Sequence, residues 1–236
     1  MTIEYDQLAP NAANFVPLTP LSFLQRTADI YPQREALIYN QRRYTWAQTR
    51  NRCTRIASSL AARGIGKNDT VSVFAFNTPE MFESHFSIPM AGAVLNTINT
   101  RLDAATVAYI IDHGESRVFI CDRQLWPVLE EALQSCELEP EIIIIDDADA
   151  AEKPELPTNV AFSFYEDLVD RGDDTFEWLP PEDEWQALTL NYTSGTTGLP
   201  KGVVYHHRGS YLMTMGTVIS WALPPHPRYL YTVPMF

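Results

Sequence analysis

An alternation of helix-type and strand-type patterns along the middle of the chain constrains its fold most strongly. Residues 44–66 (YTWAQTRNRCTRIASSLAARGIG) space their apolar side chains as in a helix, with Thr45 as the expected N-cap and Gly64 as the stop. The pattern predicts further elements: strands at 70–76, 93–98, 117–122 and 141–146, and helices from about Pro79 to Ala91 and at 103–113. This order predicts an α/β fold made of parallel β-α-β units, not a sandwich or a helix bundle.

An acidic segment, residues 146–184, interrupts the alternation. It holds 14 of the 30 acidic residues, together with prolines at 154, 157, 180 and 181. We interpret the segment as a solvated connection, because runs of charge are usually wetted surface, and keep an acidic docking segment as the alternative. Residues 185–192 (WQALTLNY) then resume as a strand.

The charge balance and the cysteines exclude several classes of protein. A formal net charge of −13 repels both nucleic acid and anionic membrane surfaces. Cys53, Cys121 and Cys136 lie far apart without CxxC spacing, which favours reduced thiols over a disulfide framework or a zinc site. The first ten residues lack a signal-peptide pattern, and no apolar run is long enough to span a bilayer. We therefore expect a cytoplasmic protein with no membrane span and no nucleic-acid partner.

The segment 191–207 (NYTSGTTGLPKGVVYHH) concentrates glycines, hydroxyls and a lysine. Free backbone N–H groups and hydroxyls can donate to polyphosphate, and a lysine adds a positive charge. The Walker pattern GxxxxGK[ST] is not met, because Lys201 follows Pro200 and precedes Gly202. The residues after Lys201 are strand-like, so we expect this loop to join two strands; a glycine-rich surface turn is the alternative.

Other polar and aromatic residues near this loop have structural interpretations. His206 and His207 are expected to be neighbours on a strand, pointing to opposite faces, with no third metal ligand at suitable spacing. His85, His113 and His226 are isolated, and we expect surface or capping roles. Met215 and Trp221, on a helix after the loop, could line an acyl pocket, but helical spacing favours plain core. Asn96, Asn99 and Arg101 are expected to order a turn.

Residues 192–203 (YTSGTTGLPKGV) resemble the signature of the adenylate-forming superfamily, which includes acyl-CoA synthetases, 4-coumarate-CoA ligases, luciferases and peptide-synthetase adenylation domains. The resemblance extends over 19–39, 44–65, 76–113 and 229–236. Two shorter segments, 99–107 and 231–236, look most like medium-chain, 3-methylthiopropanoate-CoA and benzoate-CoA ligase-like enzymes. The resemblance implies that residues 1–236 are part of the N-terminal (large) AMP-binding domain, with the C-terminal domain absent.

The same resemblance implies an ATP-dependent carboxylic acid–CoA ligase. Such an enzyme first forms an acyl-adenylate and pyrophosphate, and CoA then displaces AMP to give the acyl-CoA. The implied contacts to the β- and γ-phosphates come from Thr193, Ser194, Gly195, Thr196, Thr197 and Lys201. Thr196 is the expected Mg²⁺ contact, Lys201 and Thr196 are the expected catalytic residues, and Gly198 with Gly202 would permit loop movement. We expect the 236-residue chain to be inactive alone.

Two alternatives stay open, namely an adenylating enzyme with a non-CoA acceptor and a noncatalytic module. The carboxylic acid substrate is not determined, and a homodimer is a family-level expectation only. The final run 228–236 (RYLYTVPMF) is rich in aromatic and β-branched residues, so it predicts a core strand. An apolar strand at the very end predicts that the sequence is part of a longer protein.

Overall fold

A seven-stranded sheet forms the centre of the computed structural model, which describes residues 7, 9–156, 158–193 and 198–236. The strand order is β7-β6-β5-β3-β4-β8-β9. All neighbours run parallel except β9, which runs antiparallel to β8. The strands are β3 (Thr70–Phe74), β4 (Val94–Thr97), β5 (Ser116–Asp122), β6 (Glu141–Ile145), β7 (Phe162–Phe164), β8 (Ala187–Thr193) and β9 (Lys201–His206).

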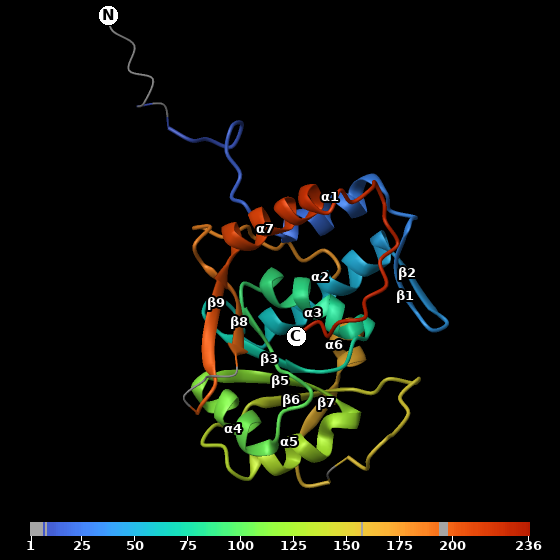
Figure 1. The fold of residues 1–236 in the computed structure, drawn as a ribbon, viewed down its shortest axis with the longest axis vertical. Helices are drawn as coiled ribbons and strands as arrows, with labels where there is room; N and C mark the ends of the chain where they lie inside the picture. The colour runs from blue at the N-terminus through green and yellow to red at the C-terminus, as the bar shows by residue number, and fades with distance from the viewer. Residues whose placement is uncertain (1–6, 8, 157, 194–197) are drawn as a thin grey trace, which may run out of the picture.

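Helices cover both faces of the sheet (Figure 1). One apolar core packs the sheet against α2 (Trp46–Ala62), α3 (Pro79–Met90) and α6 (Tyr165–Arg171). The second core lies against α4 (Ala104–His113) and α5 (Trp126–Leu133). Alternate residues of β3, β5 and β6 enter opposite cores, as the period of two in a strand requires. The α/β fold with parallel β-α-β units is therefore confirmed.

Local sequence signals account for the helix boundaries that were expected. Thr45 caps α2 in a capping box with Gln48: its side chain accepts from the Gln48 N–H, and the Gln48 side chain accepts from the Thr45 N–H at 2.8 Å. Thr78 caps α3 and Asp103 caps α4 in the same manner. Gly64 follows α2 with a φ of 74°, a conformation that glycine adopts without strain.

The acidic segment contains more structure than a connection. Strand β7 and helix α6 lie within it, and α6 packs on the core through Leu168, which is fully buried. After α6 the chain passes so close to α2 that a Cβ on Gly172 would lie 2.0 Å from the carbonyl oxygen of Arg55. Much of the negative charge is paired, as in the ion pairs from Arg52 to Glu166 and from Arg55 to Asp174.

Further elements lie outside the pattern expected from the sequence, α5 among them. Helix α1 (Leu21–Ile30) packs on α2 and α3, and the antiparallel hairpin of β1 (Glu35–Tyr39) and β2 (Arg42–Thr45) leads into α2. A short 3₁₀ turn, η2 (Arg123–Leu125), precedes α5. In the last part of the chain, α7 (His207–Ser220) follows β9 directly.

The prediction of a core strand at 228–236 is wrong. These residues form an irregular segment without strand pairing, in which Leu230 is 82% exposed. A strand needs a neighbour to satisfy its backbone, and none lies beside this segment in the described part of the chain. Instead, the Asn77 side chain donates to the Val233 carbonyl at 2.8 Å and accepts from the Met235 N–H at 2.9 Å.

The cysteines and the helices agree with two further expectations. All three cysteines are free; Cys53 and Cys121 are buried and Cys136 is half-buried. Burial raises the pKa of the Cys53 thiol well above its usual value, so this side chain behaves as a small apolar group. Among the described residues, no helix has the length and apolar character needed to cross a bilayer.

Candidate functional site

The hairpin of β8 and β9 frames the glycine-rich loop. Thr193 at the end of β8 pairs across the hairpin with Lys201 at the start of β9. The expectation that the loop joins two strands is confirmed. Four of the expected phosphate contacts, Ser194, Gly195, Thr196 and Thr197, lie outside the residues that the structure describes.

The two described polar side chains of the expected set lie together at the base of this loop. Thr193 and Lys201 are both exposed and occupy one cross-strand position. Within the described part of the chain, the Lys201 ammonium pairs with no carboxylate, although the protein carries 30 acidic residues. An unpaired ammonium beside a hydroxyl can bind an anionic oxygen without first breaking an ion pair.

The glycines of the loop are needed for different reasons. Gly198 has a φ of 121°, which side-chain-bearing residues rarely adopt, so glycine supplies backbone freedom there. Gly202 has an ordinary φ, but a Cβ at this position would lie 2.9 Å from the Leu190 Cδ1 and 3.6 Å from the Tyr192 ring. At Gly202 the missing side chain provides space for the neighbouring strand.

Two contacts attach the carboxyl end of β8 to the rest of the fold. The Asn191 amide donates to the Thr97 hydroxyl on β4 at 2.9 Å. The Tyr192 hydroxyl lies 2.7 Å from the His113 Nδ1 at the end of α4. Burial raises the pKa of Tyr192 to about 12, so the phenol keeps its proton at neutral pH and can donate to the imidazole. No local sequence pattern indicates either contact.

The two adjacent histidines hold the start of α7. His206 is the last residue of β9 and accepts from the Gly209 N–H at 3.0 Å as an N-cap. His207 begins α7, so the expectation that both histidines lie on one strand is wrong. Its Nδ1 lies 2.8 Å from the Thr19 hydroxyl, and burial, aided by the neighbouring His206, lowers the pKa of His207 to about 4. Their role is structural, and no group of three metal-ligating side chains gathers among the described residues.

The other candidate residues differ in how far they are exposed to solvent. Trp221 and Met215 are 63% and 40% exposed, so the expectation of plain core is wrong for both. Asn99 accepts from the Arg101 N–H at 2.9 Å and orders a turn as expected. Asn96 instead lies buried within β4, where its amide donates to the Ser72 hydroxyl at 2.9 Å.

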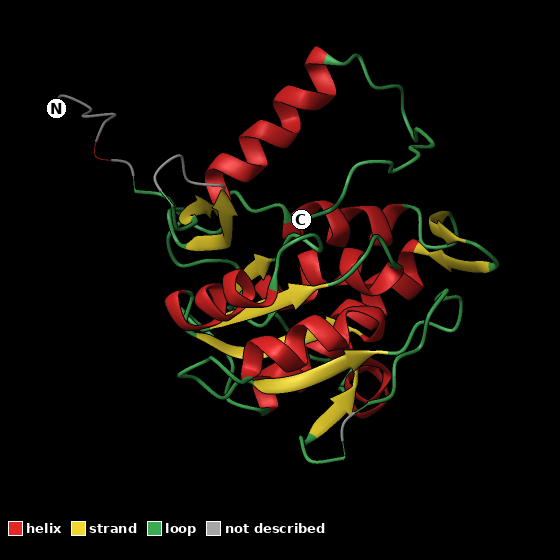
Figure 2. Cartoon of the chain, turned by 60° about the horizontal axis from the view of Figure 1, so that its bottom comes forward, coloured by secondary structure: helices red, strands yellow, loops and turns green. Residues whose placement is uncertain are grey.

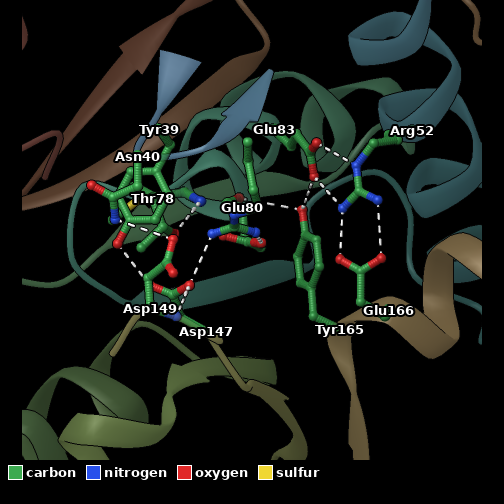
Figure 3. A network of polar contacts seen from close by, with 12 residues as sticks. Tyr39, Asn40, Arg52, Thr78, Glu80, Glu83, Asp147, Asp149, Tyr165 and Glu166 are labelled. Carbon is green, nitrogen blue, oxygen red and sulfur yellow. Dashed lines mark hydrogen bonds and ion pairs between the residues drawn. The ribbon is translucent and has the colours of Figure 1, made fainter. Parts of the chain in front are cut away.

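A second polar cluster lies at the carboxyl ends of β3 and β6 (Figure 3). Arg42 pairs with the buried Glu80 at 2.6 Å and with Asp147 at 3.0 Å. Arg52 bridges the buried Glu83 and the exposed Glu166. The cluster borders a cavity of about 460 Å³. These charges are committed to ion pairs that join the β1–β2 hairpin, α2, α3 and α6, which indicates a structural framework.

Solved structures with the same fold include CoA ligases. The anthranilate CoA ligase AuaEII, determined with anthranoyl-AMP, superposes with a TM-score of 0.76 over 87% of this chain and 38% of that one, at 24% identity. A putative long-chain-fatty-acid CoA ligase from Rhodopseudomonas palustris superposes with a TM-score of 0.77 over 92% of this chain and 52% of that one, at 22% identity. At these identities the similarity shows the fold.

Sequence comparison finds nearer relatives among plant enzymes. Probable acyl-activating enzyme 6 of Arabidopsis thaliana is 44% identical over 98% of this chain and 43% of its own length. The peroxisomal acetate/butyrate–CoA ligase AAE7 of Arabidopsis thaliana is 44% identical over 99% of this chain and 42% of its own length. Acetate–CoA ligase CCL3 of Humulus lupulus is 42% identical, again over 99% and 42%.

The chain thus spans less than half the length of the curated relatives it matches. The family model described as "AMP-binding enzyme" matches residues 24–236, a range that includes the β8–β9 hairpin and its glycine-rich loop. This match covers most of the chain and agrees with both the fold and the motif. The chain belongs to the AMP-binding enzyme family.

Proposed function

We propose that this chain provides the ATP phosphate-binding part of an ATP-dependent carboxylic acid–CoA ligase. The observation that carries the proposal is the β8–β9 hairpin, which places Thr193 opposite Lys201 where the glycine-rich loop begins and ends; Lys201 forms no ion pair with any described residue. The names of the relatives support the reaction, because several are ligases that join short carboxylic acids to CoA. We infer a short-chain carboxylic acid as the substrate class.

The proposed reaction has two steps. A carboxylate oxygen attacks the α-phosphorus of ATP, the bond to the β-phosphate oxygen breaks, and pyrophosphate leaves with the bonding electrons. The CoA thiolate then attacks the acyl carbon, and AMP leaves. In the first step negative charge builds up on the departing pyrophosphate, so preformed donors beside it lower the barrier.

Each residue of the loop has a proposed part in that first step. Lys201 holds its positive charge against the β- and γ-phosphates, and Thr193 donates a hydroxyl hydrogen bond from the facing strand. Gly198 and Gly202 keep the backbone free of side chains, so that N–H groups can approach the phosphates. Ser194, Gly195, Thr196 and Thr197 are proposed as the remaining donors of the loop.

We propose that a magnesium ion arrives with ATP. Mg²⁺ usually keeps phosphate oxygens and waters as most of its ligands, so one protein hydroxyl is sufficient, and we propose Thr196 for this contact. When bound, the ion would neutralise charge on the phosphates.

Two assays on the whole protein test the proposal. Radiolabelled pyrophosphate should exchange into ATP only when a carboxylic acid is added, with acetate and butyrate as the first acids tried. Adding CoA should then convert the acid to its thioester. Exchange without thioester formation would indicate a different acceptor, and the absence of exchange with every acid would refute adenylation. Cytoplasmic location and a possible homodimer remain predictions.

A further inference from the structure

We propose that Tyr192 and His113 are positioning residues that set the place of the phosphate-binding loop. Tyr192 directly precedes Thr193, the residue from which the loop leaves β8. His113 is the last residue of α4, 79 positions earlier in the chain. The inference rests on the proposed function, because it assigns the pair a part in binding ATP.

The contacts of Tyr192 fix both ends of its side chain. Its hydroxyl lies 2.7 Å from the His113 Nδ1. Its ring meets the His113 ring edge-on at 5.7 Å between centroids and the Tyr109 ring edge-on at 6.4 Å. Tyr109 and His113 are one turn apart on α4, so the ring and the hydroxyl both rest on the same helix.

Two glycines make room for this arrangement. Gly202 faces Tyr192 across the hairpin, and a Cβ there would lie 3.6 Å from the Tyr192 ring and 2.9 Å from Leu190. On the other side, a Cβ on Gly114 would lie 3.2 Å from the Tyr192 hydroxyl and 2.8 Å from the Ile110 carbonyl. A Cβ at Gly114 would crowd the Tyr192 hydroxyl, and a Cβ at Gly202 would crowd Leu190 beside the tyrosine.

The contact between Tyr192 and His113 lies at the base of the loop, where it can hold the loop in place. Strand β8 pairs with β4 in the register of Leu95 with Thr189, whereas the loop begins only after Thr193. On its other side β8 pairs antiparallel with β9, whose side chains are mostly exposed and therefore anchor the hairpin in no core. Tyr192 thus ties the end of the hairpin to the packed body. Hydrogen-bond donors that stabilise a developing charge must be positioned to within a fraction of an ångström. If the base of the hairpin loosens, the loop therefore binds ATP more weakly.

The test compares two substitutions that each remove one phenolic hydroxyl. Tyr192→Phe removes the hydrogen bond to His113, and the control Tyr39→Phe removes a hydrogen bond of 2.6 Å to Asp147, far from the loop. In the whole enzyme, Tyr192→Phe should raise KM for ATP about threefold to tenfold, the range that one hydrogen bond supports. Tyr39→Phe should leave KM for ATP unchanged.

A pair of histidine variants separates positioning from general stability. His113→Ala should raise KM for ATP as Tyr192→Phe does, and His113→Asn should restore it, because the asparagine amide lies close to the place of Nδ1. Equal KM values for wild type and Tyr192→Phe, or equal effects of Tyr192→Phe and Tyr39→Phe, would overturn the inference.

Hydrogen exchange provides a readout that does not depend on activity. Peptides covering 187–206 should exchange faster in Tyr192→Phe than in wild type, with no change in Tyr39→Phe; unchanged exchange would refute the tie to α4. If wild type shows no acid-dependent pyrophosphate exchange, the proposed function fails together with the ATP role assigned here. The exchange of these peptides would still decide whether Tyr192 anchors the hairpin.

Discussion

The sheet centre and the β9–α7 region contain similar secondary structure but differ in packing. Every residue of β3 is buried, whereas five of the six residues of β9 are exposed. In α3 nine residues are buried, whereas in α7 only His207 is. Figure 2 shows α7 projecting away from the layers of sheet and helix. Regular hydrogen bonding therefore does not imply a shared core, and the glycine-rich loop connects β8 to β9, the strand with which the exposed region begins.

Besides the pairing of β9 with β8, a few side-chain contacts hold the β9–α7 region to the body. His207 contacts Thr19, Arg208 pairs with Glu184 at 2.8 Å, and Tyr211 stacks on Phe23 with ring centroids 4.6 Å apart. Apolar side chains on the rest of α7 face solvent, among them Ile219 at 74% exposed. The comparison predicts that mutations in the centre change global stability and that mutations on α7 change it little.

The largest expected effect comes from removing a core aromatic. Phe119 is fully buried and meets Phe74 edge-on at 6.4 Å. Phe119→Ala should lower the free energy of unfolding by about 3–5 kcal/mol, because it removes buried area and leaves a cavity. The matched variant Ile219→Ala should stay within about 0.5 kcal/mol. Urea unfolding followed by circular dichroism measures both, and similar losses in the two would contradict the comparison.

Two glycine substitutions should have opposite signs. Gly172→Ala places a Cβ 2.0 Å from the Arg55 carbonyl oxygen, so α6 must move away from α2 at a cost of about 1–3 kcal/mol. Gly216→Ala lies within α7, where a Cβ meets nothing within 4 Å. Alanine is the better helix former there, so this variant should stabilise α7 by about 0.5–1 kcal/mol. The midpoint of thermal unfolding should fall for Gly172→Ala and rise for Gly216→Ala. Midpoints that shift in the same direction would contradict the contrast between these two positions.

A smaller effect is expected from lowering the pH. The pKa of His207 is lowered to about 4 in the folded protein, so between pH 6.5 and 4 the unfolded chain binds the proton more readily. The stabilisation is present above pH 6.5 and is lost as the pH falls through this window. After allowance for solvent screening, we expect a loss on the order of 1 kcal/mol by pH 5.

Hydrogen exchange of α7 at pH 7 and pH 5 measures the loss, with rates corrected for the intrinsic effect of pH. His207→Gln removes the titrating group and should flatten the difference between the two conditions. If wild type and His207→Gln change equally with pH, another group controls the attachment of α7.

Elements set by local signals could be predicted from the sequence. The capping pair Thr45 and Gln48 lies within one helical turn, and the buried strands β3, β5 and β6 are short apolar runs. Helix α6 was missed because Glu166 and Asp167 in its first turn resemble the acidic segment around it, while its buried Leu168 depends on tertiary contacts. The tail at 228–236 was predicted as a strand from composition, but composition supplies no pairing partner.

In the candidate site, too, features with a local sequence signal could be predicted and long-range contacts could not. Lys201 and the glycines could be found because the motif is contiguous in sequence. The contact between Tyr192 and His113 joins residues 79 positions apart, so no local pattern contains it. His207 was assigned to the wrong element because the chain changes from strand to helix between two identical residues. The contacts that tie the loop to the fold could therefore be identified only from the structure.

One measurement tests the central claim, that the β8–β9 hairpin binds the phosphates of ATP, most directly. Acid-dependent pyrophosphate exchange should be compared in wild type, Lys201→Ala and Lys67→Ala, where Lys67 is an exposed lysine paired with Glu182 at 2.8 Å. We predict that Lys201→Ala slows exchange at least about tenfold, since a charged contact to phosphate is lost, while Lys67→Ala matches wild type. Unchanged exchange in Lys201→Ala would contradict the account.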